Sequence, residues 1–254
     1  MTKIPVTREI LIVGNPDELS HRAAEEFVLL ADVAIRAKGF FTVALSGGST
    51  PRGLYLQLAS DTYREQVTWP HVHLFWGDER CVPPDHPESN YHMVCEALIN
   101  RVPIPKENIY RIPAEQEDRA RAAMEYEQAL RTFFHLKAGA FPRFDLILLG
   151  MGDDGHTASL FPFTTALDET DRLVLANYVE KLGVYRLTFS VPTLNQAREV
   201  IFLISGTSKA SVLREVLEGD YQPKRLPSQL IQPVNGRLWF IADLSAASKL
   251  KSYE

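Results

Sequence analysis

Short apolar runs, each about the length of a β-strand, alternate with helix-like segments along the chain, and this alternation limits the possible folds more than any other feature. The runs are rich in Val, Ile, Leu and Phe and do not alternate with polar residues, as in "EILIV" (9–13) and "FDLILLG" (144–150). Continuous apolar strands are typical of a sheet that is buried on both faces. The sequence therefore predicts an α/β fold, with a doubly wound, mainly parallel sheet and helices on both faces.

The other predicted elements follow the same order. Further strands are predicted at residues 41–46, 72–76, 186–191, 199–205 and 237–243. Helices are predicted at residues 16–37, from Pro51 onward, and at residues 89–101, 115–139 and 208–218. No repeat, low-complexity tract or Pro/Gly-rich linker divides the sequence, so we expect a single domain over residues 1–254. Ligands of such sheets bind at the carboxyl ends of strands, so the loops after residues 46, 76, 150, 190 and 205 are the candidate sites.

Composition narrows the classes of function. The 254 residues carry a net charge of −5 and contain no run of Lys and Arg, so we expect no nucleic-acid partner. The two cysteines, Cys81 and Cys95, form neither a metal-type pair nor a disulfide framework, which fits a reducing compartment. Residues 1–14 lack the apolar core of a signal peptide, and no run approaches the roughly 20 apolar residues of a membrane span. We expect a cytoplasmic protein without membrane contact; a monomer is compatible with the sequence, which does not fix the oligomeric state.

The stretch "ALSGGSTPRGLY" (44–55) has the pattern of an anion site. A strand ends before two glycines, and Ser49 or Thr50 is placed to cap a helix that has Pro51 in its first turn. Successive backbone N–H groups there would hold a phosphate at the positive end of the helix, although a plain capped turn is the alternative. The expected binding residues are Ser46, Gly47, Gly48, Ser49, Thr50 and Arg52.

Charged residues also follow the strand predicted at residues 72–76. In "GDERCVPPDHPESNY" (77–91), three charged residues, Asp78, Glu79 and Arg80, stand at the end of a buried strand, where ligand contact is favoured. A solvated loop with internal ion pairs fits this stretch equally well. His71 and His73 share one face of the strand, but no third ligand stands at a metal-type spacing, so we expect no bound metal.

The stretch "LILLGMGDDGHTASLFP" (146–162) admits two interpretations. Its three glycines have the G-x-G-x-x-G spacing of a dinucleotide-binding turn. Such a turn should open a long helix, yet Pro162 follows Gly155 by only seven residues, and two aspartates inside the turn would repel a diphosphate. We therefore expect no nucleotide cofactor.

Acid–base chemistry fits the same turn better. The pKa of an imidazole is about 6.5, so His156 can accept a proton at neutral pH, and Asp154 could orient the ring as the third group of a triad does. A surface histidine beside a capping aspartate is the alternative. No G-x-S-x-G or H-E-x-x-H motif occurs, which disfavours a serine nucleophile or a zinc hydrolase. Arg186 begins a predicted strand and Lys209 a predicted helix, and either could hold an anion.

Three blocks together, "LSGGSTP", "FWGDERCVP" with "ESNY", and "FDLILLGMGDDGHTASLFP", resemble the 6-phosphogluconolactonase family over nearly the whole chain. The resemblance implies hydrolysis of 6-phospho-D-glucono-1,5-lactone in the pentose phosphate pathway, without cofactor or metal, on an α/β fold of the sugar-phosphate isomerase/deaminase type. It implies that His156 is the general base, that residues 46–50 belong to the phosphate loop, and that three cations bind substrate, namely Arg80, Arg186 and Lys209. We expect water to attack the lactone carbonyl while His156 takes its proton and Arg80 stabilises the oxyanion that forms. The family commonly has Pro where this chain has Asp153.

Two alternatives remain. Glucosamine-6-phosphate deaminases share the D-G-H turn and the phosphate loop, but they resemble "MDEY" where this chain has "GDER" (77–80). A non-enzymatic sugar-phosphate-binding domain would need the phosphate loop without a poised base, and His156 beside Asp154 disfavours it. The expected partner in each case is a small phosphorylated sugar or its lactone.

Overall fold

The computed structural model describes residues 8–251. Residues 1–7, which belong to the segment considered above for a signal peptide, lie outside the described residues. Within residues 8–251, no helix is long and apolar enough to cross a membrane.

A parallel sheet of seven strands forms the centre of the described part of the chain. Its strands are β1 (Arg8–Val13), β2 (Phe41–Leu45), β3 (Val72–Trp76), β5 (Ile109–Tyr110), β6 (Leu146–Leu149), β9 (Glu199–Ile204) and β10 (Arg237–Asp243). They lie in the order β1-β10-β9-β6-β2-β3-β5, and every neighbouring pair is parallel. All residues of β2 and β6 are buried, as their unbroken apolar runs predict. The predicted mainly parallel α/β sheet is confirmed.

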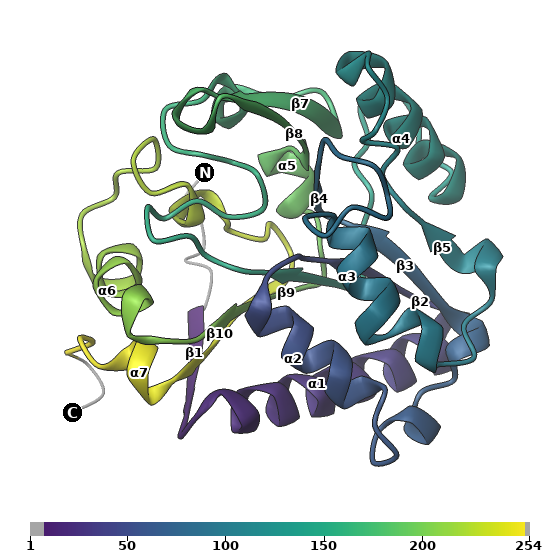
Figure 1. Cartoon of the computed structure of the whole chain (residues 1–254), viewed down its shortest axis with the longest axis horizontal. Coiled ribbons are helices and arrows are strands. Elements are labelled where there is room, and N and C mark those ends of the chain that lie inside the picture. The colour runs from purple at the N-terminus through teal and green to yellow at the C-terminus, as the bar shows by residue number, and fades with distance from the viewer. Residues whose placement is uncertain (1–7, 252–254) are drawn as a thin grey trace.

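Helices connect the strands and flank the sheet. They are α1 (Pro16–Lys38), α2 (Ser49–Leu58), α3 (Asn90–Ala97), α4 (Arg119–Phe133), α5 (Val191–Leu194), α6 (Ala210–Glu218) and α7 (Leu244–Ala247). Helices α1 and α2 lie along one side of the sheet, whereas α4 and α5 lie on the other (Figure 1). The ends of α1 have sequence signals: the side chain of Asn15 accepts from the backbone N–H of Glu18, and Gly39 ends the helix with a φ of 89°.

The strand predicted at residues 186–191 is present, but its placement in the main sheet is wrong. It is β8 (Val184–Phe189), which pairs antiparallel with β4 (Asp78–Arg80) and β7 (Val174–Val179) in a separate sheet. Leu187 and Phe189 of β8 are buried, and the ring of Phe189 stacks on that of Tyr126 in α4. Burial by a helix gives the same apolar pattern as burial within a parallel sheet, so the sequence alone did not separate them.

The chain changes direction across the sheet between β2 and β6. Within the seven-stranded sheet, the strand that follows β2 in the chain is β3, its neighbour on one side. The strand of this sheet that follows β6 is β9, its neighbour on the opposite side, so a crevice opens beyond the carboxyl ends of β2 and β6. The buried Asp145 fixes their alignment, since its Oδ2 accepts from both the backbone N–H and the hydroxyl of Thr42 at 2.8 Å. The glycine loop after β2 and the histidine turn after β6 therefore start side by side.

Candidate active site

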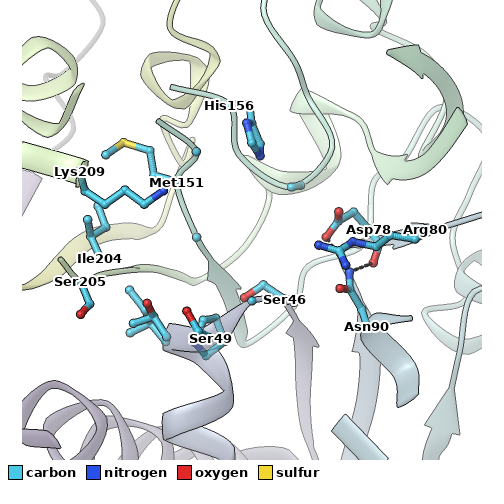
Figure 2. Close-up of a pocket in the computed structure, with 18 residues that line it drawn as sticks. Ser46, Ser49, Asp78, Arg80, Asn90, Met151, His156, Ile204, Ser205 and Lys209 are labelled. Carbon is cyan, nitrogen blue, oxygen red and sulfur yellow. Dashed lines mark hydrogen bonds between the residues drawn. The ribbon is translucent and has the colours of Figure 1, made fainter. Parts of the chain in front are cut away.

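A cavity of about 240 Å³ lies at this edge of the sheet (Figure 2). Loops that follow β2, β3, β6 and β9 all contribute to it, as the rule for open α/β sheets predicts. In Figure 2, Lys209 and Arg80 lie on opposite sides of the cavity, and His156 lies across it from Ser46 and Ser49. The lining residues are 46–51, Asp78, Arg80, Asn90, 150–152, His156, Ala158, 203–205 and Lys209.

Helix α2 begins at this cavity without a side-chain cap. Its N-cap is Gly48, with a φ of 106°, and no side chain makes a capping hydrogen bond there. The prediction that Ser49 or Thr50 caps the helix is wrong, because the helix already begins at Ser49 and both residues lie in its first turn. The hydroxyl oxygen of Ser46 is buried and has no hydrogen-bond partner within the described residues. These groups together offer donors to an anion.

Positions 47 and 48 of this loop require glycine for different structural reasons. Gly48 adopts a positive φ that other residues rarely take. A Cβ on Gly47 would lie 1.8 Å from Oδ1 of Asn90, so a side chain at this position would displace Asn90 from the cavity wall. A plain capped turn requires neither feature.

Glu79, one of the three charged residues expected to contact a ligand, lines neither this cavity nor the adjoining one and instead holds the opposite wall in place. Its carboxylate accepts from the hydroxyl of Ser89 at 3.0 Å and from the backbone N–H groups of Asn90 and Tyr91 at 2.8 and 2.9 Å. Burial raises the pKa of Glu79, and these N–H donors oppose the shift. Glu79 is thus a structural carboxylate that fixes the start of α3.

Asp78 links this wall to the histidine turn. It is buried, and its Oδ2 accepts from the hydroxyl of Ser159 at 2.7 Å. The side-chain amide of Asn90 donates to the backbone oxygen of Asp78 at 3.0 Å and lies 3.5 Å from its Oδ1. This second carboxylate oxygen has only a long contact, so it can accept from a ligand hydroxyl.

Two arginines lie opposite each other on the small sheet. Arg80 of β4 pairs in register with Arg186 of β8, and the Nη1 of Arg80 donates to the backbone oxygen of Glu88 at 2.7 Å. Burial lowers the pKa of Arg186, and the charge of Arg80 lowers it further. Two cations close together favour an anionic ligand between them.

His156 and Asp154 form the pair that sequence reasoning proposed. The Nδ1 of His156 lies 2.6 Å from Oδ1 of Asp154, while the Nζ of Lys181 lies 3.3 Å from the other carboxylate oxygen. The hydrogen bond to His156 is the main reason that the pKa of Asp154 is well below its usual range. The ring of His156 stacks on that of Phe161 at a centroid distance of 4.1 Å. The imidazole is therefore held on one edge and one face.

Two glycines of the turn allow His156 to take its position. A Cβ on Gly152 would lie 2.1 Å from two ring atoms of His156, so the ring can occupy its position only because residue 152 has no side chain. Gly155 has a φ of 79°, and a Cβ there would lie 2.6 Å from the side chain of Leu226. No α-helix opens after these glycines; turns lead to a short 3-10 helix at Thr165–Asp168. The long helix that a dinucleotide-binding turn would open does not follow the turn within these described residues.

Lys209 enters the cavity from the short 3-10 helix Thr207–Lys209 that follows β9. The loop before it is fixed by the buried Asp243, whose carboxylate accepts from the hydroxyl of Ser205 at 2.6 Å and from the backbone N–H of Gly206. The ammonium group of Lys209 contacts Oδ1 of Asp153, the residue two positions before Gly155. Residues 56 positions apart in the sequence thus meet beside the histidine turn.

The structure does not bring all predicted residues to one place. Arg186 lines an adjoining cavity of about 350 Å³, which shares Asp78, Arg80 and His156 with the first and also contains Lys181. Arg52 lines neither cavity. It is exposed because α2 turns Pro51, Leu54 and Tyr55 toward the core and Arg52 toward solvent.

Sequence reasoning missed four polar residues that shape the site: Asn90, Ser159, Lys181 and Asp243. Each acts through a contact with a residue at least 12 positions away in the chain. No local motif signals such contacts. Asn90 is the one that the sequence could have indicated, since it lies in the "ESNY" block that carries the family resemblance.

Comparison with known proteins assigns the chain to a family. The family described as "Glucosamine-6-phosphate isomerases/6-phosphogluconolactonase" matches residues 14–240. The chain belongs to this family. A 6-phosphogluconolactonase of Synechocystis sp. is 46% identical over 243 residues, which cover 96% of this chain and 98% of that protein.

Solved structures agree with this assignment. A 6-phosphogluconolactonase from Trypanosoma cruzi matches with a TM-score of 0.85 at 29% identity, covering 99% of this chain and 100% of that one. A monomeric glucosamine-6-phosphate deaminase matches with a TM-score of 0.78 at 22% identity, covering 95% of this chain and 99% of that one, and it shares the fold.

The fit of His156 against residue 152 can be tested directly. Gly152→Ala should displace the imidazole and break its contact with Asp154, because the new methyl group would overlap the ring. We expect a changed imidazole NMR signal and a loss of about 1–3 kcal/mol in the free energy of unfolding. Gly150→Ala is the matched control, since a Cβ there meets nothing within 4 Å. An unchanged imidazole signal in Gly152→Ala would contradict this account of the turn.

Proposed function

We propose that this protein is a 6-phosphogluconolactonase that hydrolyses 6-phospho-D-glucono-1,5-lactone to 6-phospho-D-gluconate in the oxidative pentose phosphate pathway. The observation that carries the mechanism is the His156–Asp154 pair, which lies beside a cavity that also contains an uncapped helix start and Lys209. A base and an anion site in one small cavity are what hydrolysis of a phosphorylated lactone requires.

The phosphate end of the substrate fits the side of the cavity formed by α2. The backbone N–H groups of residues 48–50, the hydroxyl of Ser46 and the ammonium group of Lys209 can all donate to phosphate oxygens. Binding there positions the lactone ring, and binding energy from the remote phosphate orients the carbonyl for attack. Asp78, with one carboxylate oxygen free to accept, is suited to a hydroxyl of the ring.

The tautomer of His156 depends on its partner. Asp154 is ionised at neutral pH, and its lowered pKa keeps it so in weak acid, so Nδ1 of the imidazole donates to it and Nε2 carries the free lone pair. Nε2 then takes a proton from a water molecule as the water oxygen attacks the lactone carbonyl carbon. Asp154 stabilises the imidazolium that forms.

Charge develops on the carbonyl oxygen as the tetrahedral intermediate forms. Arg80, on the side of the cavity opposite Lys209, is the cation we assign to this oxyanion, and Arg186 supports it from the adjoining cavity. The bond between the carbonyl carbon and the ring oxygen then breaks, and the imidazolium returns its proton to that oxygen, which becomes a hydroxyl. Water is the only co-reactant, so the scheme needs neither cofactor nor metal.

A single assay separates this function from its alternatives. The lactone is generated in situ from glucose 6-phosphate, and acid release is followed with and without the protein. Glucosamine 6-phosphate is tested in parallel for ammonia release. We expect faster acid release and no ammonia; ammonia release would favour a deaminase, and acceleration of neither reaction would favour a sugar-phosphate-binding domain.

Removal of the proposed base should abolish most of the activity. His156→Asn should lower kcat by about 10²- to 10⁴-fold, the usual contribution of general base catalysis, and leave KM nearly unchanged because the phosphate contacts remain. Steady-state kinetics of lactone hydrolysis measures both constants. Near-normal kcat in this variant would exclude His156 as the base.

Asp154→Asn tests the orienting carboxylate. An amide no longer fixes the Nδ1–H tautomer, so we expect kcat to fall while 6-phosphogluconate still binds. Because folding lowers the pKa of Asp154, its contribution to stability is full at neutral pH and is lost only as the pH falls below about 4. Urea unfolding should therefore show the variant less stable than the natural protein at neutral pH, with a difference that shrinks in acid. A difference that grows in acid would contradict the assigned interaction.

A further inference from the structure

An ion pair joins the lysine of the proposed phosphate site to the histidine turn, and no proposed catalytic step uses it. The ammonium group of Lys209, whose side chain is 24% exposed, contacts the carboxylate of Asp153, which is 68% exposed. Lys209 lines the cavity that we assign to the phosphate, whereas Asp153 lines the adjoining one. The carboxylate thus neutralises a cation that a phosphorylated ligand also needs.

We propose that Asp153 is an affinity-determining residue: its carboxylate competes with the ligand phosphate for Lys209 and so weakens the binding of substrate and product. The inference rests on the proposed function, in which Lys209 holds the phosphate. When the ligand binds, Lys209 exchanges a carboxylate partner for a phosphate partner, and Asp153 returns to solvent.

The surroundings of the two side chains allow Lys209 to exchange the carboxylate of Asp153 for a phosphate. The loop that precedes Lys209 is fixed by the hydrogen bonds between Asp243 and residues 205–206, so the lysine side chain starts beside the cavity that it lines. Asp153 is mostly exposed, and its carboxylate can be hydrated when Lys209 leaves it. An exposed pair of this kind contributes roughly 0.2–1 kcal/mol, which corresponds to an expected gain of about 1.4- to 5-fold in ligand affinity when the competitor is removed.

The test is the variant Asp153→Asn, which keeps the size of the side chain and removes its charge. Binding of 6-phosphogluconate is measured by calorimetry, and kcat and KM are measured for the lactone. We expect Kd and KM to fall by about 1.4- to 5-fold, with kcat little changed. Asp168→Asn is the matched control, because Asp168 pairs with Lys224 at 3.4 Å, both side chains are about two-thirds exposed, and neither lines the two cavities. We expect no change in that control.

The same substitution in a variant that lacks Lys209 separates competition for this lysine from a general effect of the lost negative charge. In Lys209→Met, the added Asp153→Asn substitution should leave Kd unchanged, since no amine remains to be shared. Equal tightening with and without Lys209, or weaker binding in Asp153→Asn, would overturn the inference.

Failure of the inference can be told apart from failure of the proposed function. If the natural protein binds 6-phosphogluconate but not gluconate, and Asp153→Asn does not tighten that binding, only the role of Asp153 is wrong. If the natural protein binds no 6-phosphogluconate, the assigned phosphate site is absent, and both proposals fail.

Discussion

The site depends on the parallel pairing of β2 with β6, two strands that are about a hundred residues apart in the chain. The pairing is short, with Val43 opposite Leu146 and Ala44 opposite Ile147. Asp145 reinforces it at the amino ends of the strands, where its carboxylate binds Thr42 and an ion pair of 2.8 Å links it to Lys38. A shift of this register by one residue would turn the side chains of a strand to the opposite face of the sheet. It would also separate the anion-binding loop from the histidine turn.

A second constraint is the absence of a side chain at residue 152. The G-x-G-x-x-G spacing of the turn is the same as that of a nucleotide-binding loop, but here the glycines make room for an imidazole. Gly152 lets the ring of His156 pack against the backbone, and Gly155 provides a positive φ and a close approach to Leu226. The same spacing can therefore serve different chemistry, and the residues after the last glycine decide between the two uses. In this chain they include a histidine and an early proline, whereas a nucleotide would require a long helix.

The sequence predicted the central sheet because buried parallel strands leave an unbroken apolar pattern, as β2 and β6 show. It also predicted which edge of the sheet carries the cavity, since the carboxyl ends of such strands are the binding edge. It failed where two arrangements bury the same residues, as for β8 beneath α4, and where a helix begins earlier than its expected cap, as for α2. It failed too for Arg52, which is close to the glycine loop in the sequence but lies on the exposed face of α2, away from the cavity. Contacts such as Lys209 with Asp153 depend on two separate loops being placed together, and neither loop alone indicates the other.

The charges at the site also explain how a chain with a net charge of −5 can bind an anion. Three cations near the histidine turn already have an oxygen partner: Arg80 donates to the backbone of Glu88, Lys181 pairs with Asp154, and Lys209 pairs with Asp153. A carbonyl partner leaves the charge of Arg80 intact for a ligand, whereas a carboxylate partner neutralises its lysine. The local field therefore depends on the type of partner as well as on the number of cations. Because Lys181 and Lys209 contact the same turn through two separate, adjacent aspartates, a ligand that draws Lys209 away leaves the neighbouring His156–Asp154 pair in place.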